Sequence, residues 1–142
     1  MATRSGQELD MTRLTAIVLF LIMGVIFVRM FFHNYVSEPA RAASLWMDRA
    51  ETYRTRGVLP DLPLDGPRNP YYERAQLMRK YVMTGDEQAK QQIIQNAKRR
   101  ERAKHALAIW GSLVMVCIST IAVVGAGLPM LQEWLWERRY RA

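Results

Sequence analysis

The stretch that decides the fold is ALAIWGSLVMVCISTIAVVGAGLPML, residues 106–131, which contains no charged side chain. A helix needs about 20 apolar residues to cross a hydrocarbon core about 30 Å thick, and this stretch is longer than that. A buried helix of a water-soluble protein is normally interrupted by a charge, and the rest of this chain is too small to surround such a helix. The sequence therefore predicts a membrane span over residues 106–131.

A second apolar stretch lies near the start of the chain, LTAIVLFLIMGVIFV at residues 14–28, and Arg29 follows it. Beyond Arg29 the apolar pattern resumes, and an arginine near a helix end can extend its guanidinium to the headgroups while its stem stays in hydrocarbon. We therefore predict a first span over residues 14–33. A cleaved signal peptide is the alternative, but residues 1–13 are charge-balanced and bulky residues follow the run, which favours a retained span.

Composition limits what the rest of the chain can do. The protein has 142 residues, with 20 Lys and Arg against 13 Asp and Glu, and a single cysteine. Cys117 alone excludes a disulfide within the chain and a cysteine-based zinc or iron–sulfur site. The polar middle of about 70 residues is too small and too charged to build a large catalytic core by itself.

The polar middle is predicted to be helical except for a proline-rich strap. Pro39 suits the first turn of a helix, and Gly57 suits its C-terminal end, where positive φ is favoured. The segment GVLPDLPLDGPRNP, residues 57–70, contains four prolines and two glycines, which excludes a helix or an inner strand. We predict an extended strap that lies on an apolar surface through four aliphatic side chains, Val58, Leu59, Leu62 and Leu64.

A long helix is predicted to begin at the capping-box sequence Thr84-Gly85-Asp86-Glu87. No proline or glycine follows until Gly111, and the residues between are mostly strong helix formers. The sequence therefore predicts one continuous helix from about Gly85 to about Leu128, with Pro129 near its end and a stalk of roughly 20 residues outside the bilayer.

These patterns together predict an all-α membrane protein with two transmembrane helices, the second continuous with the stalk, joined by a helical and proline-rich loop. The predicted segments are a tail at 1–13, transmembrane helix 1 at 14–33, an extramembrane helix at 34–57, the strap at 58–70, a short helix at 71–84, the stalk at 85–105, transmembrane helix 2 at 106–131 and an aromatic and basic tail at 132–142.

Basic residues cluster next to the predicted second span. Such clusters commonly meet anionic headgroups, at about 1 kcal/mol per charge. Nucleic-acid binding is the alternative, but no base-stacking aromatic platform accompanies the cluster, so no nucleic-acid partner is expected. The excess of Lys and Arg between the spans favours a loop in the cytoplasm or matrix. The residues predicted to bind lipid headgroups, such as that of cardiolipin, are Arg29, Lys98, Arg99, Arg100, Arg102 and Lys104.

No catalytic, metal or cofactor site is expected. His33 and His105 are the two histidines, and each lies at a predicted membrane edge without the further ligands that a metal or haem site needs. Glycine-rich phosphate loops, HExxH helices and Ser/His/Asp arrangements are missing. Arg29 either extends to the headgroups or faces a carboxylate in a neighbouring chain.

Small residues predict where the second span meets a neighbouring helix. Because lipid tails are as apolar as leucine, helices in a bilayer associate by close packing at small residues. Ser119, Ala122 and Ala126 are spaced by three and four and fall on one face, so we predict that this face contacts another helix.

The sequence predicts two spans, a stalk and a strap, and no arrangement of catalytic residues is found in it. We therefore predict a non-catalytic accessory subunit of a large membrane complex, with other subunits and anionic phospholipids as partners. The composition, rich in Arg, Met and Trp, is similar in style to that of small accessory subunits of mitochondrial respiratory complexes and ATP synthases. That similarity implies an energy-transducing membrane, either the mitochondrial inner membrane or a bacterial inner membrane. The alternatives are a two-span tether or assembly factor, and a pore- or transporter-forming homo-oligomer.

Overall fold

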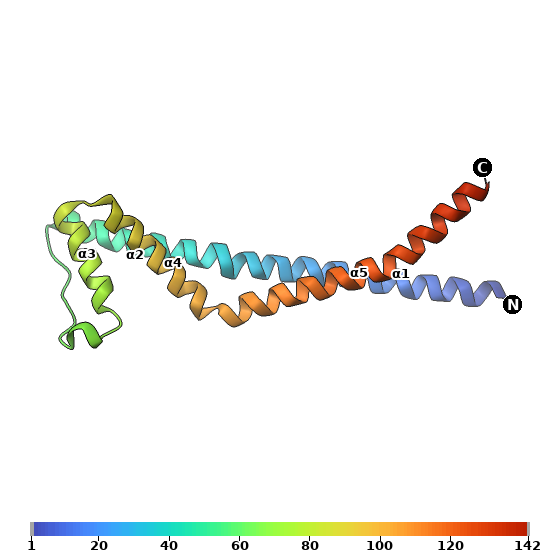
Figure 1. Ribbon diagram of the computed structural model, residues 1–142, viewed down its shortest axis with the longest axis horizontal. Helices are drawn as coiled ribbons and strands as arrows, with labels where there is room; N and C mark the ends of the chain where they lie inside the picture. The colour runs from blue at the N-terminus through green and yellow to red at the C-terminus, as the bar shows by residue number, and fades with distance from the viewer. Residues whose placement is uncertain (1, 142) are drawn as a thin grey trace. The chain divides into compact units, whose positions relative to one another are not determined.

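The computed structural model describes residues 2–141, with side chains from residue 10 onward, and over this range the chain is helical without a strand. The all-α prediction is confirmed. Figure 1 shows the elements in chain order: α1 (Ala2–Phe32), a π-helical turn (His33–Ser37), α2 (Glu38–Arg56), a short 3-10 helix (Gly66–Arg68), α3 (Tyr72–Thr84), α4 (Glu87–Lys104) and α5 (Ala106–Arg141).

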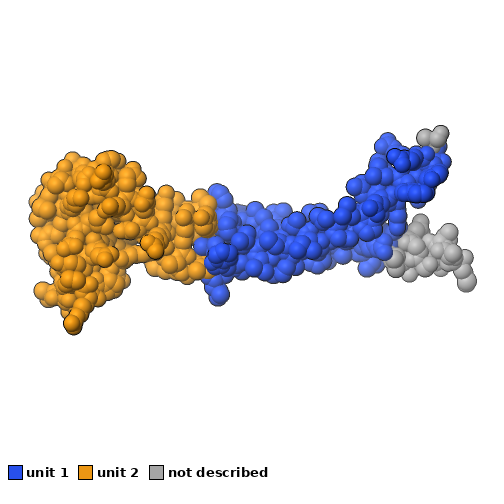
Figure 2. Space-filling model, in the orientation of Figure 1, with its two compact units in different colours: residues 1–32, 107–142 blue, residues 33–106 orange. Residues whose placement is uncertain are grey.

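The chain divides into two compact units, coloured separately in Figure 2. The described part of the first unit consists of α1 and α5, called the helix pair below. The second unit, residues 33–106, consists of α2, α3, α4 and the segments that join them, and is called the three-helix unit.

Both helices of the helix pair are long and apolar enough to cross a membrane, as the sequence predicts. They extend beyond the predicted spans, because α1 begins at Ala2 and α5 ends at Arg141. The prediction that the helix ends near Pro129 was wrong, since this proline lies inside α5. A proline ring in a helix crowds the carbonyl of the residue four positions earlier, which is Gly125 here. Because glycine has no side chain, this carbonyl has room to tilt.

The backbone stays helical past residue 33, where the first span is predicted to end. The backbone stays helical from Ala2 to Arg56, through the π-helical turn at His33–Ser37. Pro39 lacks an N–H, and its ring would clash with the carbonyl of Tyr35 in a regular α-helix. The wider π-helical turn just before the proline relieves this clash.

The helix predicted to run unbroken from Gly85 to Leu128 is interrupted at His105. Helix α4 ends at Lys104, His105 has φ −100° and ψ 15°, and α5 begins at Ala106. The residues before the break have high helix propensity, and no proline or glycine marks it. It falls next to the boundary between the two compact units, and helix propensity does not account for it.

The capping-box prediction at Thr84 was also wrong, although the predicted helix over 71–84 is present. Gly85 has φ +63° and ends α3, and the Thr84 hydroxyl donates to the carbonyl of Lys80 at 2.7 Å. Asp86 caps α4, because its carboxylate accepts the Gln88 N–H at 3.0 Å. This hydrogen bond, together with the ion pair to Lys80 at 3.2 Å, lowers the pKa of Asp86.

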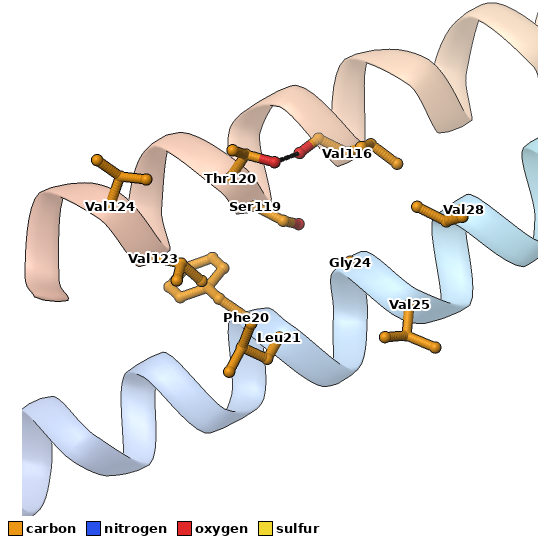
Figure 3. A pocket seen from close by; sticks show the side chains of 10 residues that line it. All are labelled: Phe20, Leu21, Gly24, Val25, Val28, Val116, Ser119, Thr120, Val123 and Val124. Carbon is orange, nitrogen blue, oxygen red and sulfur yellow. Dashed lines mark hydrogen bonds between the residues drawn. The ribbon is translucent and has the colours of Figure 1, made fainter.

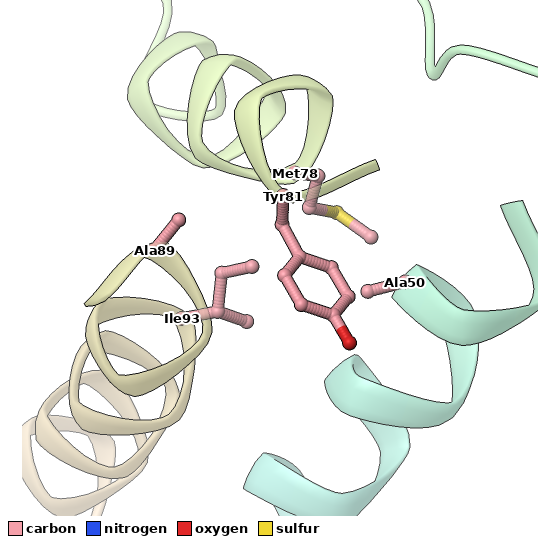
Figure 4. Packing of buried hydrophobic residues seen from close by; sticks show 5 residues of the cluster. All are labelled: Ala50, Met78, Tyr81, Ala89 and Ile93. Carbon is pink, nitrogen blue, oxygen red and sulfur yellow. The ribbon is translucent and has the colours of Figure 1, made fainter. Parts of the chain in front are cut away.

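The core of the three-helix unit is a cluster from all three helices, drawn in Figure 4: Ala50 from α2, Met78 and Tyr81 from α3, and Ala89 and Ile93 from α4. Ala50 and Ala89 are completely buried, and such small side chains let their helices approach closely. The Tyr81 ring fills the centre with only 2% of the residue exposed. Its hydroxyl donates to Glu51 and accepts from Arg54 Nη1 at 3.4 Å, so the buried polar atom has partners.

The strap has no regular structure before the short 3-10 helix at Gly66–Arg68, which agrees with the predicted extended segment. The prediction that four aliphatic side chains of the strap lie on an apolar surface does not hold for Val58 and Leu64 within this chain, whereas Leu62 is half-buried. Leu64 is fully exposed, at 104%, and Val58 is exposed as well. The chain turns at Leu64 and Asp65, so the alternation of aliphatic residues and prolines does not continue along one surface.

Candidate interaction sites

Helices α1 and α5 approach each other at Gly24 and Ser119. A Cβ atom placed on Gly24 would lie 3.5 Å from the Ser119 Cβ, which is ordinary van der Waals contact. Ser119 is buried, and its hydroxyl donates to the carbonyl of Met115 in the same helix at 2.8 Å. With its hydroxyl satisfied locally, the serine acts as a small residue that allows close helix contact.

A groove with a cavity of about 320 Å³ lies beside this contact, as Figure 3 shows. Half of its ten lining residues are valines from both helices, and Phe20 and Leu21 add further apolar surface. The Thr120 hydroxyl on its rim donates to the carbonyl of Val116 at 2.8 Å, drawn as a dashed line. The groove therefore offers apolar surface and no charged group to an occupant.

The predicted small-residue face contributes to this contact. Ser119 meets α1, and Ala122 and Ala126 are half-buried. The structure thus gives Ser119 a contact within the chain, and contact of this face with another subunit stays a prediction. Sequence reasoning missed Gly24 as the partner, although a lone glycine inside the apolar run 14–28 was a usable signal.

Two of the six predicted lipid ligands bind backbone carbonyls inside the three-helix unit. Arg102 Nε donates to the carbonyl of Tyr35 at 3.1 Å, and its guanidinium lies 4.1 Å from the centre of the Tyr35 ring. Pro39 cannot give this carbonyl the N–H that a regular α-helix would supply. Arg100 Nη2 donates to the carbonyl of Pro70 at 2.9 Å. These arginines therefore hold segments of the unit together.

The other four predicted lipid ligands are less engaged. Lys104 forms an ion pair with Glu101 at 3.3 Å and remains exposed. Arg29 and Arg99 are exposed and Lys98 is half-buried, and none of the three forms an ion pair with the side chains of residues 10–141. Headgroup binding by these side chains stays a prediction, and their positions leave them available for it.

The two histidines each face a glutamate. His33 lies 3.4 Å from Glu38, and His105 lies 3.2 Å from Glu101. Among the described residues, no group of three or more His, Cys, Asp and Glu side chains could hold a metal ion.

No protein-family model matches the sequence, and comparisons with curated proteins and solved structures found no match.

The contact between α1 and α5 predicts an efficient cross-link. When Gly24 and Ser119 are both replaced by Cys in a Cys117→Ser background, we expect oxidation to form a disulfide within one chain. The reason is that the two Cβ positions lie 3.5 Å apart, at the short end of the range that disulfides adopt. Non-reducing electrophoresis followed by mass spectrometry of the linked peptides measures the product.

The matched control places the first cysteine at Val25 instead of Gly24. Val25 is next in sequence and exposed, and it lines the groove beside the contact and does not belong to the contact itself. We expect little intramolecular product from Val25→Cys with Ser119→Cys. Equal yields from the two pairs, or cross-links only between separate chains, would contradict the contact.

Proposed function

We propose that this chain is a two-span, non-catalytic accessory subunit of a multi-subunit membrane complex, in which it braces neighbouring subunits and contacts anionic lipid. The observation that carries the proposal is the exposure of large apolar side chains in both units. In the helix pair the exposed side chains suit contact with hydrocarbon or with other spans. In the three-helix unit the exposed apolar side chains suit contact with the surface of a partner protein.

The helix pair supports insertion as two spans. Its exposed apolar residues lie on several sides of both helices, and this distribution suits helices that are surrounded by lipid tails and partner helices. Trp134, Trp136 and Tyr140 follow the second apolar stretch, with Arg138 stacked on Trp134 at 4.9 Å. Aromatic and basic residues of this kind are typical of a membrane interface.

The three-helix unit supports contact with partner proteins. Leu64 projects completely from the turn of the strap, and Val58, Tyr71 and Met83 are also more than half exposed. Single exposed apolar residues are common on proteins, but a leucine that touches nothing in its own chain is well suited to fill a pocket on a partner. This exposure favours a bracing subunit over a chain that acts alone.

Lipid contact is supported by the free basic side chains. Lys98, Arg99 and Arg29 have no ion-pair partner among the side chains of residues 10–141, and basic residues near a span attract anionic headgroups such as that of cardiolipin. An energy-transducing membrane, either the mitochondrial inner membrane or a bacterial inner membrane, is supported by the compositional similarity alone. The loop is assigned to the matrix or cytoplasm on its excess of Lys and Arg.

Blue-native electrophoresis of mildly solubilised membranes, with mass spectrometry of co-migrating proteins, tests the proposal. We expect the chain in a stable assembly with several different proteins. Migration only with copies of itself would contradict the proposal and favour a pore-forming homo-oligomer. A loose association with one partner would also contradict it and favour a tether or assembly factor.

The exposed leucine of the strap gives a sharper test. Leu64→Ser is expected to change the unfolding free energy of the isolated chain by less than about 0.5 kcal/mol, because the side chain makes no contact to lose. The same change should reduce the share of the chain that migrates in the large assembly. Leu64→Ile keeps an apolar side chain and serves as the control that should assemble normally. If Leu64→Ser assembles as well as the control, Leu64 does not contact a partner.

A further inference from the structure

Two arginines of the three-helix unit lie close together at the start of α3 and form no ion pair. Arg74 lies on the first turns of α3, and Arg100 comes from α4. Arg100 donates to the carbonyl of Pro70 at 2.9 Å, and Pro70 precedes Arg74 by four residues, which is about one helical turn. The hydrogen bond therefore fixes Arg100 beside the segment that carries Arg74.

Arg74 is held by aromatic rings. Its guanidinium carbon lies 3.9 Å from the centre of the Trp46 ring and 5.4 Å from the centre of the Tyr71 ring. A third arginine, Arg49, also lies over Trp46, at 4.9 Å. Stacking uses the flat face of a guanidinium and leaves its N–H edge available to an acceptor in the plane. The rings therefore fix the orientation of Arg74 and leave its guanidinium N–H groups available to an acceptor.

The positive charges are close enough to oppose one another. Burial lowers the pKa of Arg74, and the nearby charges of Arg100 and Arg49 lower it further. No carboxylate among the side chains of residues 10–141 pairs with any of the three. Glu101, next to Arg100 in sequence, pairs instead with Lys104 and His105, at 3.3 Å and 3.2 Å. Like charges gathered without a counter-charge are a favourable setting for an anion.

We propose that Arg74 and Arg100 form a binding site for a phosphate group, with the charge of Arg49 strengthening the attraction. The planar forks of two oriented guanidinium groups match the several oxygens of a phosphate better than the two of a carboxylate. The site uses neither Arg29, Lys98 nor Arg99. Phosphate binding at this site does not depend on the proposed function, because the binding can be measured on the isolated chain.

The phosphate could belong to a phospholipid headgroup or to a soluble compound, and the test separates these sources. Full-length protein labelled with fluorotryptophan is placed in phosphatidylcholine nanodiscs, and the Trp46 signal is identified by its loss in Trp46→Phe. Inorganic phosphate is titrated in one arm, and phosphatidic acid is added to the nanodiscs in the other. Trp110, which belongs to the helix pair and lies within the predicted second span, is the internal control.

We expect a saturable shift of the Trp46 signal in at least one arm. A shift with inorganic phosphate identifies a soluble source, and a shift only with phosphatidic acid identifies a headgroup. Arg74→Gln and Arg100→Gln should each weaken the response about tenfold or more, since each removes a charge-assisted bidentate contact. Arg74→Lys should also weaken it, because an ammonium keeps the charge but lacks the fork.

Arg56→Gln is the matched control, because Arg56 is exposed at the end of α2 and its loss removes the same charge from the same unit. Arg49→Gln, expected to weaken binding less than Arg74→Gln, tests the site should Arg74→Gln fail to fold. The proposal is overturned if neither arm shifts Trp46, if acetate at equal ionic strength acts as strongly as phosphate, or if Arg56→Gln weakens binding as much as Arg100→Gln.

Discussion

Replacing Tyr81 by alanine is expected to lower the free energy of unfolding of the three-helix unit by about 3–5 kcal/mol. The ring is almost fully buried between α2 and α4, and its removal leaves a cavity at the centre of the core cluster (Figure 4). The substitution also leaves Glu51 and Arg54 without the hydroxyl that they share. Hydrogen exchange of the α2, α3 and α4 amides, measured on the full chain in micelles, would report the loss.

Tyr81→Phe separates the ring from the hydroxyl. The hydrogen bond to Glu51 and burial raise the pKa of Tyr81 in the folded state above its value in an unfolded chain, which is about 10. Stabilisation that depends on the protonated Tyr81 hydroxyl is therefore fully present below about pH 10. It is lost as the pH rises through the higher folded-state pKa. The phenylalanine variant should lack this alkaline loss. Tyr53→Ala, at an exposed position of α2, should have little effect, and a loss equal to that of Tyr81→Ala would disprove the assignment of the core.

Ala97→Pro is the second change expected to have a large effect, of about 3 kcal/mol or more on the three-helix unit. Ala97 is 6% exposed within α4. A proline at this position removes the N–H that bonds to the carbonyl of Ile93, and its ring clashes with that carbonyl. Because Ile93 belongs to the core, the distortion reaches the contact with α2 and α3. Assembly into a complex should therefore fall more than membrane insertion, as measured by native electrophoresis and by alkaline extraction of membranes.

The control for this change is Glu87→Pro in the same helix. Glu87 is the first residue of α4, where the N–H has no partner within the helix and proline is well tolerated. We expect this variant to assemble nearly as well as the unaltered chain. If both prolines are tolerated, or both abolish assembly, the effect at Ala97 does not come from its place in the packed interior of α4.

The fold could be predicted from the sequence where a local signal determines it. Apolar run length predicts both long helices, and the glycines at 57 and 85, with φ +65° and +63°, end α2 and α3 as glycines commonly do. The continuity of α1 with α2 and the break at His105 were missed. The continuity follows from the wider π-helical turn that accommodates Pro39, and the break at His105 leaves no signal in helix propensity.

The candidate sites were predicted less completely, for a similar reason. The small-residue spacing predicts that Ser119 lies on a packing face, because the spacing belongs to one helix. Counting charges predicts Arg100 and Arg102 as headgroup ligands but does not show that each also binds a backbone carbonyl, 30 and 67 positions earlier in the chain. The arrangement of Arg74 and Arg100 near Trp46 draws on three helices, so no sequence spacing describes it.

The exposed strap makes this chain naturally divisible. A cut after Arg68 would yield two polypeptides, one carrying α1 and α2 and the other carrying α3, α4 and α5, each with one apolar helix long enough to span a membrane. The contacts of α2 with α3 and α4, and the bond from Arg102 to the Tyr35 carbonyl, would all join the two fragments noncovalently. The strap supplies none of the main core cluster, so it acts chiefly as a tether between two complementary halves. The protein is thus suited to fragment complementation, with a reporter divided between the cut ends.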